Sequence, residues 1–216
     1  MSTLHYKVSG MEPNPATEHL QVIRTLMERS ALYRRALAPI MLVAGILGVV
    51  AAALGLALRI ESIPAFGGLW LGTAVVAVAG ALLIARRQAL KDREPFWSPP
   101  TRRVTQALLL PLTAGLLFSA IVIVFDPGHN RWLFIFPNVF FYGCALHAAG
   151  FFMSRGIRIF AWMMILLGAG ALLIIPSLQT DPSPALDHML MGFFFGVLHL
   201  AYGIYLYLTE QRKNAA

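Results

Sequence analysis

Charge is the property that this sequence has least of. Only 12% of its 216 residues are charged, whereas 58% are hydrophobic. Soluble domains carry roughly 25% charged residues, so a chain of this composition could not cover its apolar surface with polar side chains in water. The composition excludes an ordinary soluble domain and favours a lipid bilayer as the solvent.

Cysteine is almost absent too, and the common catalytic motifs are missing. Cys144 is the single cysteine, which excludes an internal disulfide and a Cys-x-x-Cys motif. The sequence also contains no phosphate-binding loop, no His-Glu-x-x-His zinc-protease motif and no nucleophile elbow. The hydroxyl and amide side chains inside the apolar runs leave catalysis open, but these absences make a non-enzymatic protein our expectation.

Charge is missing above all from six long apolar runs, which hold no Asp, Glu, Lys or Arg deep inside. They cover residues 37–58, 64–85, 104–125, 132–153, 157–175 and 188–208. A transmembrane helix needs about 20 apolar residues, whereas strands of a membrane barrel are shorter and alternate. We therefore predict an all-α polytopic membrane protein with six transmembrane helices. Proton pumps and ion-coupled carriers usually place an acid or base in such runs, so these classes are disfavoured.

What the sequence does contain is a one-sided distribution of basic residues. Of the 17 Lys and Arg residues, 15 lie at the termini or at the connections after the second and fourth runs (Arg158 is the second residue of the fifth run), and only Arg59 and Arg131 lie in the other connections. Positive charge favours the cytoplasmic side, so we predict a protein of the cell (inner) membrane with both termini cytoplasmic, including the tail at 209–216. We expect the basic flanks to attract anionic lipid headgroups. Their placement disfavours nucleic-acid binding despite the net charge of +7.

A polar segment, residues 1–36, precedes the first run. Asn14 followed by Pro15 is a typical helix start, and the residues after it have an amphipathic pattern. Its apolar side contains Val22, Ile23, Leu26, Met27 and Tyr33. Such a helix can lie on the cytoplasmic leaflet, or it can dock a cytoplasmic protein partner through residues 14–36. The sequence leaves both alternatives open.

The fourth and sixth runs share a faint internal repeat. Residues 140–150 and 194–203 both read as aromatic residues, then Gly, Leu-His, Ala and Gly. Ala-Gly pairs recur in the first, third and fifth runs. Three related helical hairpins would explain this pattern, and chance similarity between apolar sequences would explain it as well.

Two histidines inside these runs, His147 and His199, are the main candidates for chemistry. Each lies at helical spacing from glycines, and small residues mark the faces on which membrane helices approach closely. These glycines form an expected interior packing stripe: Gly143, Gly150, Gly192, Gly196 and Gly203. We expect the fourth and sixth spans to pack through these stripes and to bring the histidines together.

A pair of intramembrane histidines supports several chemistries. Imidazole is a usual axial ligand of b-type haem, so haem b held by His147 and His199 is one hypothesis. A transition-metal site that adds Cys144 is another. The structural alternative is that each histidine is hydrogen-bonded to a neighbouring carbonyl or hydroxyl and holds the bundle together.

Two further patterns bear on ligands and assembly. The connections opposite the basic ones hold four candidate metal ligands: Asp126, His129, Asp187 and His188. Asp187 is also a suitable residue for the start of a helix. Gly68 and Gly72 form a GxxxG motif, which is typical of a homo-oligomer contact or of internal packing.

These patterns predict a non-enzymatic binding, sensing or accessory subunit of the membrane. A b-type haem electron-transfer protein that uses His147 and His199 is the first alternative. A small transporter or channel is the second.

Overall fold

The computed structural model describes residues 15–125, 131–174 and 183–215, with side chains over 36–125, 132–174 and 183–209. All the regular secondary structure in this part of the chain is helical. Its elements are α1 (Pro15–Ala57), α2 (Ile63–Lys91), α3 (Pro99–Phe125), α4 (Arg131–Ala149), α5 (Arg155–Ile174), α6 (Pro184–Met191), the π-helix η2 (Gly192–Val197) and α7 (Leu198–Ala215).

Six of these helical segments are long and apolar enough to cross a membrane, as predicted. They cover Ala36–Ala57, Ile63–Lys91, Pro99–Phe125, Trp132–Ala149, Arg155–Ile174 and Pro184–Thr209, the last of which combines α6, η2 and α7. The helices α2 and α3 extend beyond the predicted apolar runs at the connection that joins them. The prediction of an all-helical chain with six helices that are long and apolar enough to span a membrane is therefore confirmed.

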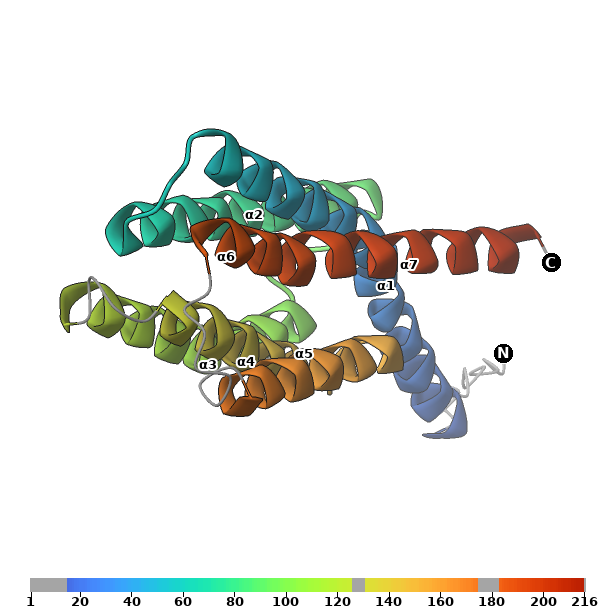
Figure 1. Cartoon of the computed structure of the whole chain (residues 1–216). Helices are drawn as coiled ribbons and strands as arrows, with labels where there is room; N and C mark the ends of the chain where they lie inside the picture. The colour runs from blue at the N-terminus through green and yellow to red at the C-terminus, as the bar shows by residue number, and fades with distance from the viewer. Residues whose placement is uncertain (1–14, 126–130, 175–182, 216) are drawn as a thin grey trace, which may run out of the picture.

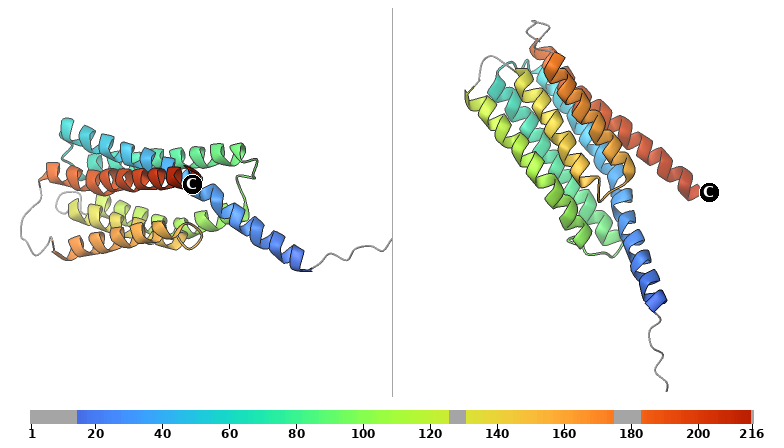
Figure 2. Two further views of the ribbon diagram at one scale, coloured as in Figure 1. Left: turned by 90° about the vertical axis from the view of Figure 1, so that its right-hand side faces the viewer. Right: turned by 90° about the horizontal axis from the view of Figure 1, so that it is seen from below.

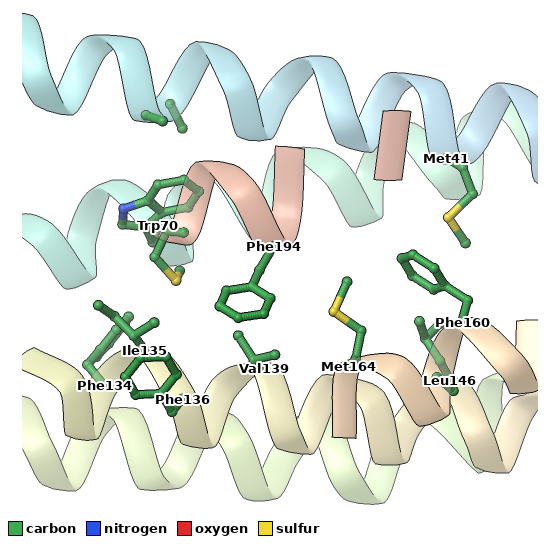
Figure 3. Close-up of a cluster of buried hydrophobic side chains, with 14 of the residues drawn as sticks. Met41, Trp70, Phe134, Ile135, Phe136, Val139, Leu146, Phe160, Met164 and Phe194 are labelled. Atoms are coloured by element: carbon green, nitrogen blue, oxygen red, sulfur yellow. The ribbon is translucent and has the colours of Figure 1, made fainter. Parts of the chain in front are cut away.

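The helices form two layers (Figure 1, Figure 2). In the first layer α1 is central, between α2 and the combined helix α6–η2–α7. In the second layer α4 is central, between α3 and α5. Apolar side chains fill the space between the layers, and Figure 3 shows Trp70, Phe194 and Met41 pointing towards the second layer.

The packing does not follow three hairpins. The helices α1 and α2 pack together, and so do α3 and α4, but α5 packs mainly along α4 whereas α7 packs along α1. The third predicted hairpin is therefore not a packed pair. The contact of α1 with α7 brings together the first and last helices of the chain, and its cause is the glycine packing described below.

The helix α1 is much longer than one membrane span. It starts at Pro15, as the Asn14-Pro15 pair predicts, and continues without a break for 43 residues, with Pro39 inside. At about 1.5 Å per residue this is roughly 65 Å, against about 30 Å for a hydrocarbon core. The first part of α1 therefore projects from the bundle (Figure 2).

The point where α1 leaves the bundle is tightly enclosed. Ala36, Leu37 and Ala38 are exposed by only 2%, 3% and 1%. Successive residues of a helix point about 100° apart, so three consecutive buried residues require neighbours on most sides of the helix. We call this end of the bundle, where the α2–α3 and α4–α5 connections and the end of α7 also lie, the basic end.

Candidate functional site

Glycines bring the backbones of α1 and α6–η2–α7 into direct contact. A Cβ atom added to Gly45 would lie 2.6 Å from the amide nitrogen of Leu200, and one added to Gly48 would collide with the carbonyl group of Phe195. A Cβ on Gly196 would lie 2.9 Å from the amide nitrogen of Val49. These distances are too short for any side chain, so the two helices meet through their main chains.

The predicted stripes do not face each other, and the expectation that the fourth and sixth spans pack through them is wrong. Gly143 faces Ile165 of α5, and Gly150 faces Arg158 of the same helix. The stripe of the last span faces α1 instead: Gly192 lies against Ala52, Gly196 against Val49 and Gly203 against Leu42. Each stripe contacts its neighbour within its own layer, because only neighbours within a layer approach closely enough to need glycine.

The π-helix η2 changes the direction in which the side chains of the last span point before and after it. In a regular α-helix, residues eleven apart such as His188 and His199 point within about 20° of each other. A π-turn adds one residue and changes this angle by roughly 100°. Accordingly, His188 faces α1 and α2, whereas His199 faces the second layer. π-Helical turns are frequent at functional sites.

The His199 ring is buried and held at both nitrogens. It is 1% exposed; its Nδ1 atom lies 3.0 Å from the Phe194 carbonyl oxygen and its Nε2 atom 2.7 Å from the Tyr142 hydroxyl of α4. A carbonyl oxygen only accepts, so Nδ1 carries the proton. In the neutral ring Nε2 then accepts a hydrogen bond from Tyr142. This bond joins the two layers.

Aromatic rings enclose His199 on its remaining sides. Phe160 of α5 contacts the imidazole edge-on at a centroid distance of 5.1 Å, and Phe195 stacks on it at 6.0 Å. Tyr202, one turn further along α7, stacks on Phe160 at 4.9 Å. The site is a filled aromatic cluster in which the imidazole occupies the centre.

His188 forms a second buried imidazole site near the opposite end of the bundle. The ring is 1% exposed. The Trp70 indole donates to its Nδ1 atom at 3.4 Å, so Nε2 carries the proton and donates to the Ile60 carbonyl oxygen at 3.0 Å. Phe66 packs on the ring at 4.8 Å, and Gly55 leaves the space that the ring fills. His188 thus links α6 to the ends of α1 and α2.

Sequence reasoning placed His188 at the start of the sixth apolar run, as a candidate metal ligand, and missed this role. The available signal was its spacing, because His188 precedes Gly192 by four residues and so begins the same glycine stripe. Trp70 and Tyr142 carried no signal of their own, since aromatic residues are common in membrane helices.

The other histidine predicted to lie inside an apolar run, His147, lies in a different place. Its ring contacts Phe151 and Trp162, each at 5.2 Å. Trp162 is 50% exposed and points roughly opposite to Phe160 on α5, because two residues correspond to about 200° of rotation. His147 and His199 therefore approach α5 from different sides.

This arrangement does not fit a haem held between His147 and His199. Haem ligation would require a free ring nitrogen on His199, but both nitrogens have protein partners. Haem binding stays a prediction, which a Soret band sensitive to His199→Ala would test. Cys144 is half-buried, and the described residues contain no cluster of three or more potential metal-binding side chains.

The second metal hypothesis falls largely beyond the described residues, because Asp126 and His129 lie outside them. Asp187 is fully buried and lies in the first turn of α6, after the Ser183 cap whose hydroxyl accepts from the Leu186 amide at 3.3 Å. A carboxylate there interacts favourably with the helix dipole, as the sequence predicts.

A polar contact also holds the second layer together. Asn138 of α4 donates to the Ser119 hydroxyl of α3 at 2.8 Å, and Ser119 donates to the Gly115 carbonyl oxygen at 2.8 Å. A second Asn138 bond reaches the Phe134 carbonyl oxygen. These groups satisfy one another, which is the common use of Asn and Ser between membrane helices.

The GxxxG motif lies in an open groove between α1 and α2. The groove has a volume of about 410 Å³, and Leu47, Leu54, Gly68, Gly72 and Val76 are among the residues that line it. A Cβ on Gly68 or Gly72 would meet no atom within 4 Å. Internal packing therefore does not explain these two glycines.

Comparison with protein-family models, with curated proteins and with solved structures found no match for this chain. Its function has to be inferred from its own residues.

Proposed function

We propose that this protein is a non-enzymatic accessory or sensing subunit of the cell (inner) membrane. In this proposal the basic end faces the cytoplasm, and residues 14–36, which include the projecting part of α1, dock a cytoplasmic protein. The observation that carries the proposal is the continuity of α1, which is a single 43-residue helix that is also the central helix of its layer.

The position of α1 supports a role in coupling. A partner that tilts or shifts the projecting segment acts on the same rigid helix that contacts η2 through Gly45 and Gly48. The enclosure of Ala36, Leu37 and Ala38 gives that helix a fixed exit from the bundle. Movement outside the membrane is therefore linked to the His199 site by direct packing.

The state of the two buried histidines supports a non-enzymatic role. Both nitrogens of His188 and both nitrogens of His199 have partners within the protein. A catalytic imidazole needs a nitrogen that can reach a substrate. The hydrogen bonds of these rings instead connect helices.

Cysteine accessibility tests the proposal. In a Cys144→Ser background, the single-cysteine variants M27C and E28C place a thiol on the apolar and polar sides of the projecting helix. We expect a membrane-impermeant maleimide to label E28C in inside-out vesicles of native membranes but to leave M27C protected. In purified protein reconstituted in vesicles that contain anionic lipid, M27C should become reactive, because the partner is absent.

Each other outcome contradicts a stated part of the proposal. Protection of M27C in both preparations would mean that the helix lies on lipid rather than on a protein. Labelling of M27C in both would mean that this face is uncovered. Labelling of E28C in right-side-out vesicles alone would reverse the proposed orientation.

A further inference from the structure

Residues 86–103, called the connection below, comprise the end of α2, the link between the helices and the start of α3, and they place buried and exposed side chains next to each other. Ala89 and Ser98 are buried, at 1% and 7% exposure, whereas their neighbours Leu90 and Trp97 are 67% and 57% exposed. The Ser98 hydroxyl is hydrogen-bonded to that of Thr101 at 3.1 Å at the start of α3. The connection is thus anchored by buried residues and also exposes two large apolar side chains.

The same connection carries a high density of uncompensated positive charge. Residues 86–103 hold six cations and two carboxylates, a net charge of +4. The six cations are all exposed: Arg86, Arg87, Lys91, Arg93, Arg102 and Arg103. Of the carboxylates, Asp92 accepts a hydrogen bond from the Gln88 amide at 3.0 Å. Within the described ranges, no ion pair is found for the four arginines at the helix ends.

The helices that lead to this connection are mainly exposed to their surroundings. The buried residues of α2 are Ile63, Phe66, Gly67, Trp70 and Ala89. The stretch of α2 from residue 71 to 88 therefore has no buried residue. Lipid that surrounds this stretch would reach the connection directly, where Arg86 and Arg87 follow the apolar run and Arg102 and Arg103 precede the next.

We infer that this surface binds anionic phospholipid headgroups, with Trp97 and Leu90 at the membrane interface. Two arginine pairs at the ends of adjacent helices match a phosphate group by charge, and arginine binds phosphate in a bidentate manner. Exposed tryptophan is typical of the membrane interface. The inference rests on the proposed placement of the basic end at a membrane surface, and it assigns lipid selectivity to this connection rather than to residues 14–36.

Quenching of Trp97 by brominated lipids tests the inference. Trp132→Phe and Trp162→Phe together leave Trp97 and Trp70, and Trp70 is shielded because it is only 4% exposed. Two vesicle preparations have the same mixture of zwitterionic and anionic phospholipid, with bromine on the chains of one lipid or the other. We expect quenching of Trp97 per brominated lipid to be at least about twofold greater when the anionic lipid carries bromine.

Matched variants decide whether the arginines cause this preference. The combined substitution of Arg86, Arg87, Arg102 and Arg103 by Gln should abolish it, whereas Arg155→Gln, an exposed residue at the same end, should leave it unchanged. If the combined variant does not fold, the unsubstituted arginines can be screened with high salt, which should reduce the preference.

Three outcomes would overturn the inference: equal quenching by both lipids, a preference that survives the combined variant, or the same preference at Trp132 when that residue replaces Trp97 as the reporter. None of these outcomes depends on whether the M27C thiol is protected, so failure here is separate from failure of the proposed function.

Discussion

Closely spaced glycines lie on both sides of α1, but their packing differs. Towards the last span, Gly45 and Gly48 allow a contact in which the two main chains touch. Towards α2, Gly68 and Gly72 face an open groove in which a Cβ atom would meet nothing. Glycine spacing therefore predicts that a close approach is sterically allowed, but it does not predict which neighbour makes that approach.

Leucine substitutions on the two sides of α1 should give the largest difference in the free energy of unfolding. Gly48→Leu would drive a side chain into the carbonyl group of Phe195, and such overpacking costs about 3 kcal/mol of folding free energy. Gly72→Leu should change the free energy of unfolding by no more than about 0.5 kcal/mol. Denaturant unfolding in detergent measures both values, and equal losses would contradict the difference between the two sides.

Loss of the hydrogen bond between His199 and Tyr142 should have the next largest effect on stability. This bond holds α7 to the second layer, whereas glycine packing holds α7 to the first layer. His199→Phe leaves the buried Tyr142 hydroxyl without an acceptor and should cost about 1–3 kcal/mol. A double-mutant cycle with Tyr142→Phe should give a coupling energy of about 0.6–1.7 kcal/mol.

His147→Phe is the matched control for that prediction. Within the described residues, the ring contacts of His147 are with two outer aromatic residues, Phe151 and Trp162. This change should therefore alter the free energy of unfolding by about 0.5 kcal/mol or less. A loss as large as that of His199→Phe would show that both histidines hold the bundle equally.

The ends of α1 and α2 provide the smallest expected effect. Arg59 and Arg93 have positive φ angles of 48° and 54°. The amide that follows each of them closes the helix end: the Ile60 amide donates to the Gly55 carbonyl oxygen at 3.0 Å, and the Glu94 amide donates to the Ala89 carbonyl oxygen at 2.9 Å. Glycine adopts this conformation without strain, so Arg93→Gly should stabilise the protein by about 0.5 kcal/mol.

A glycine at Arg87, inside α2, supplies the control for that change. It should destabilise the helix by about 1 kcal/mol, so the two substitutions differ in sign. Thermal unfolding in a single detergent compares them, and destabilisation by Arg93→Gly would mean that the cation at this helix end matters more than the backbone angle.

The fold was largely predictable because hydropathy determines which segments can span a membrane. The six spans, the helix start at Pro15 and the position of Asp187 in a first turn all follow from local patterns. The partners of each span did not follow, because every apolar helix is compatible with several neighbours. This is why the glycine stripes were assigned to each other, whereas Gly143 faces α5 and Gly196 faces α1.

The candidate site was predictable only in part, since its geometry depends on one irregular turn. The sequence indicated that His199 lies inside the bundle, but it did not indicate η2, whose extra residue points His199 towards Tyr142 while His188 points towards Trp70. A period of 3.6 residues applied to the whole span places both histidines on one face.

The most direct test of the contact between α1 and the last span is a cysteine cross-link in native membranes, in a Cys144→Ser background. The pair A52C and G192C joins positions that face each other, because a Cβ on Gly192 would lie 2.6 Å from the Ala52 Cβ atom. The two helices have to separate by about 1 Å to reach the Cβ–Cβ distance of about 3.8 Å that a disulfide requires. The pair A52C and G72C is the control, because Gly72 lines the open groove between α1 and α2. After mild oxidation, we expect the first pair to lose both thiols to a disulfide and take up no polyethylene-glycol maleimide, whereas the control pair takes up two. Equal maleimide uptake by both pairs would contradict the packing of α1 against the last span.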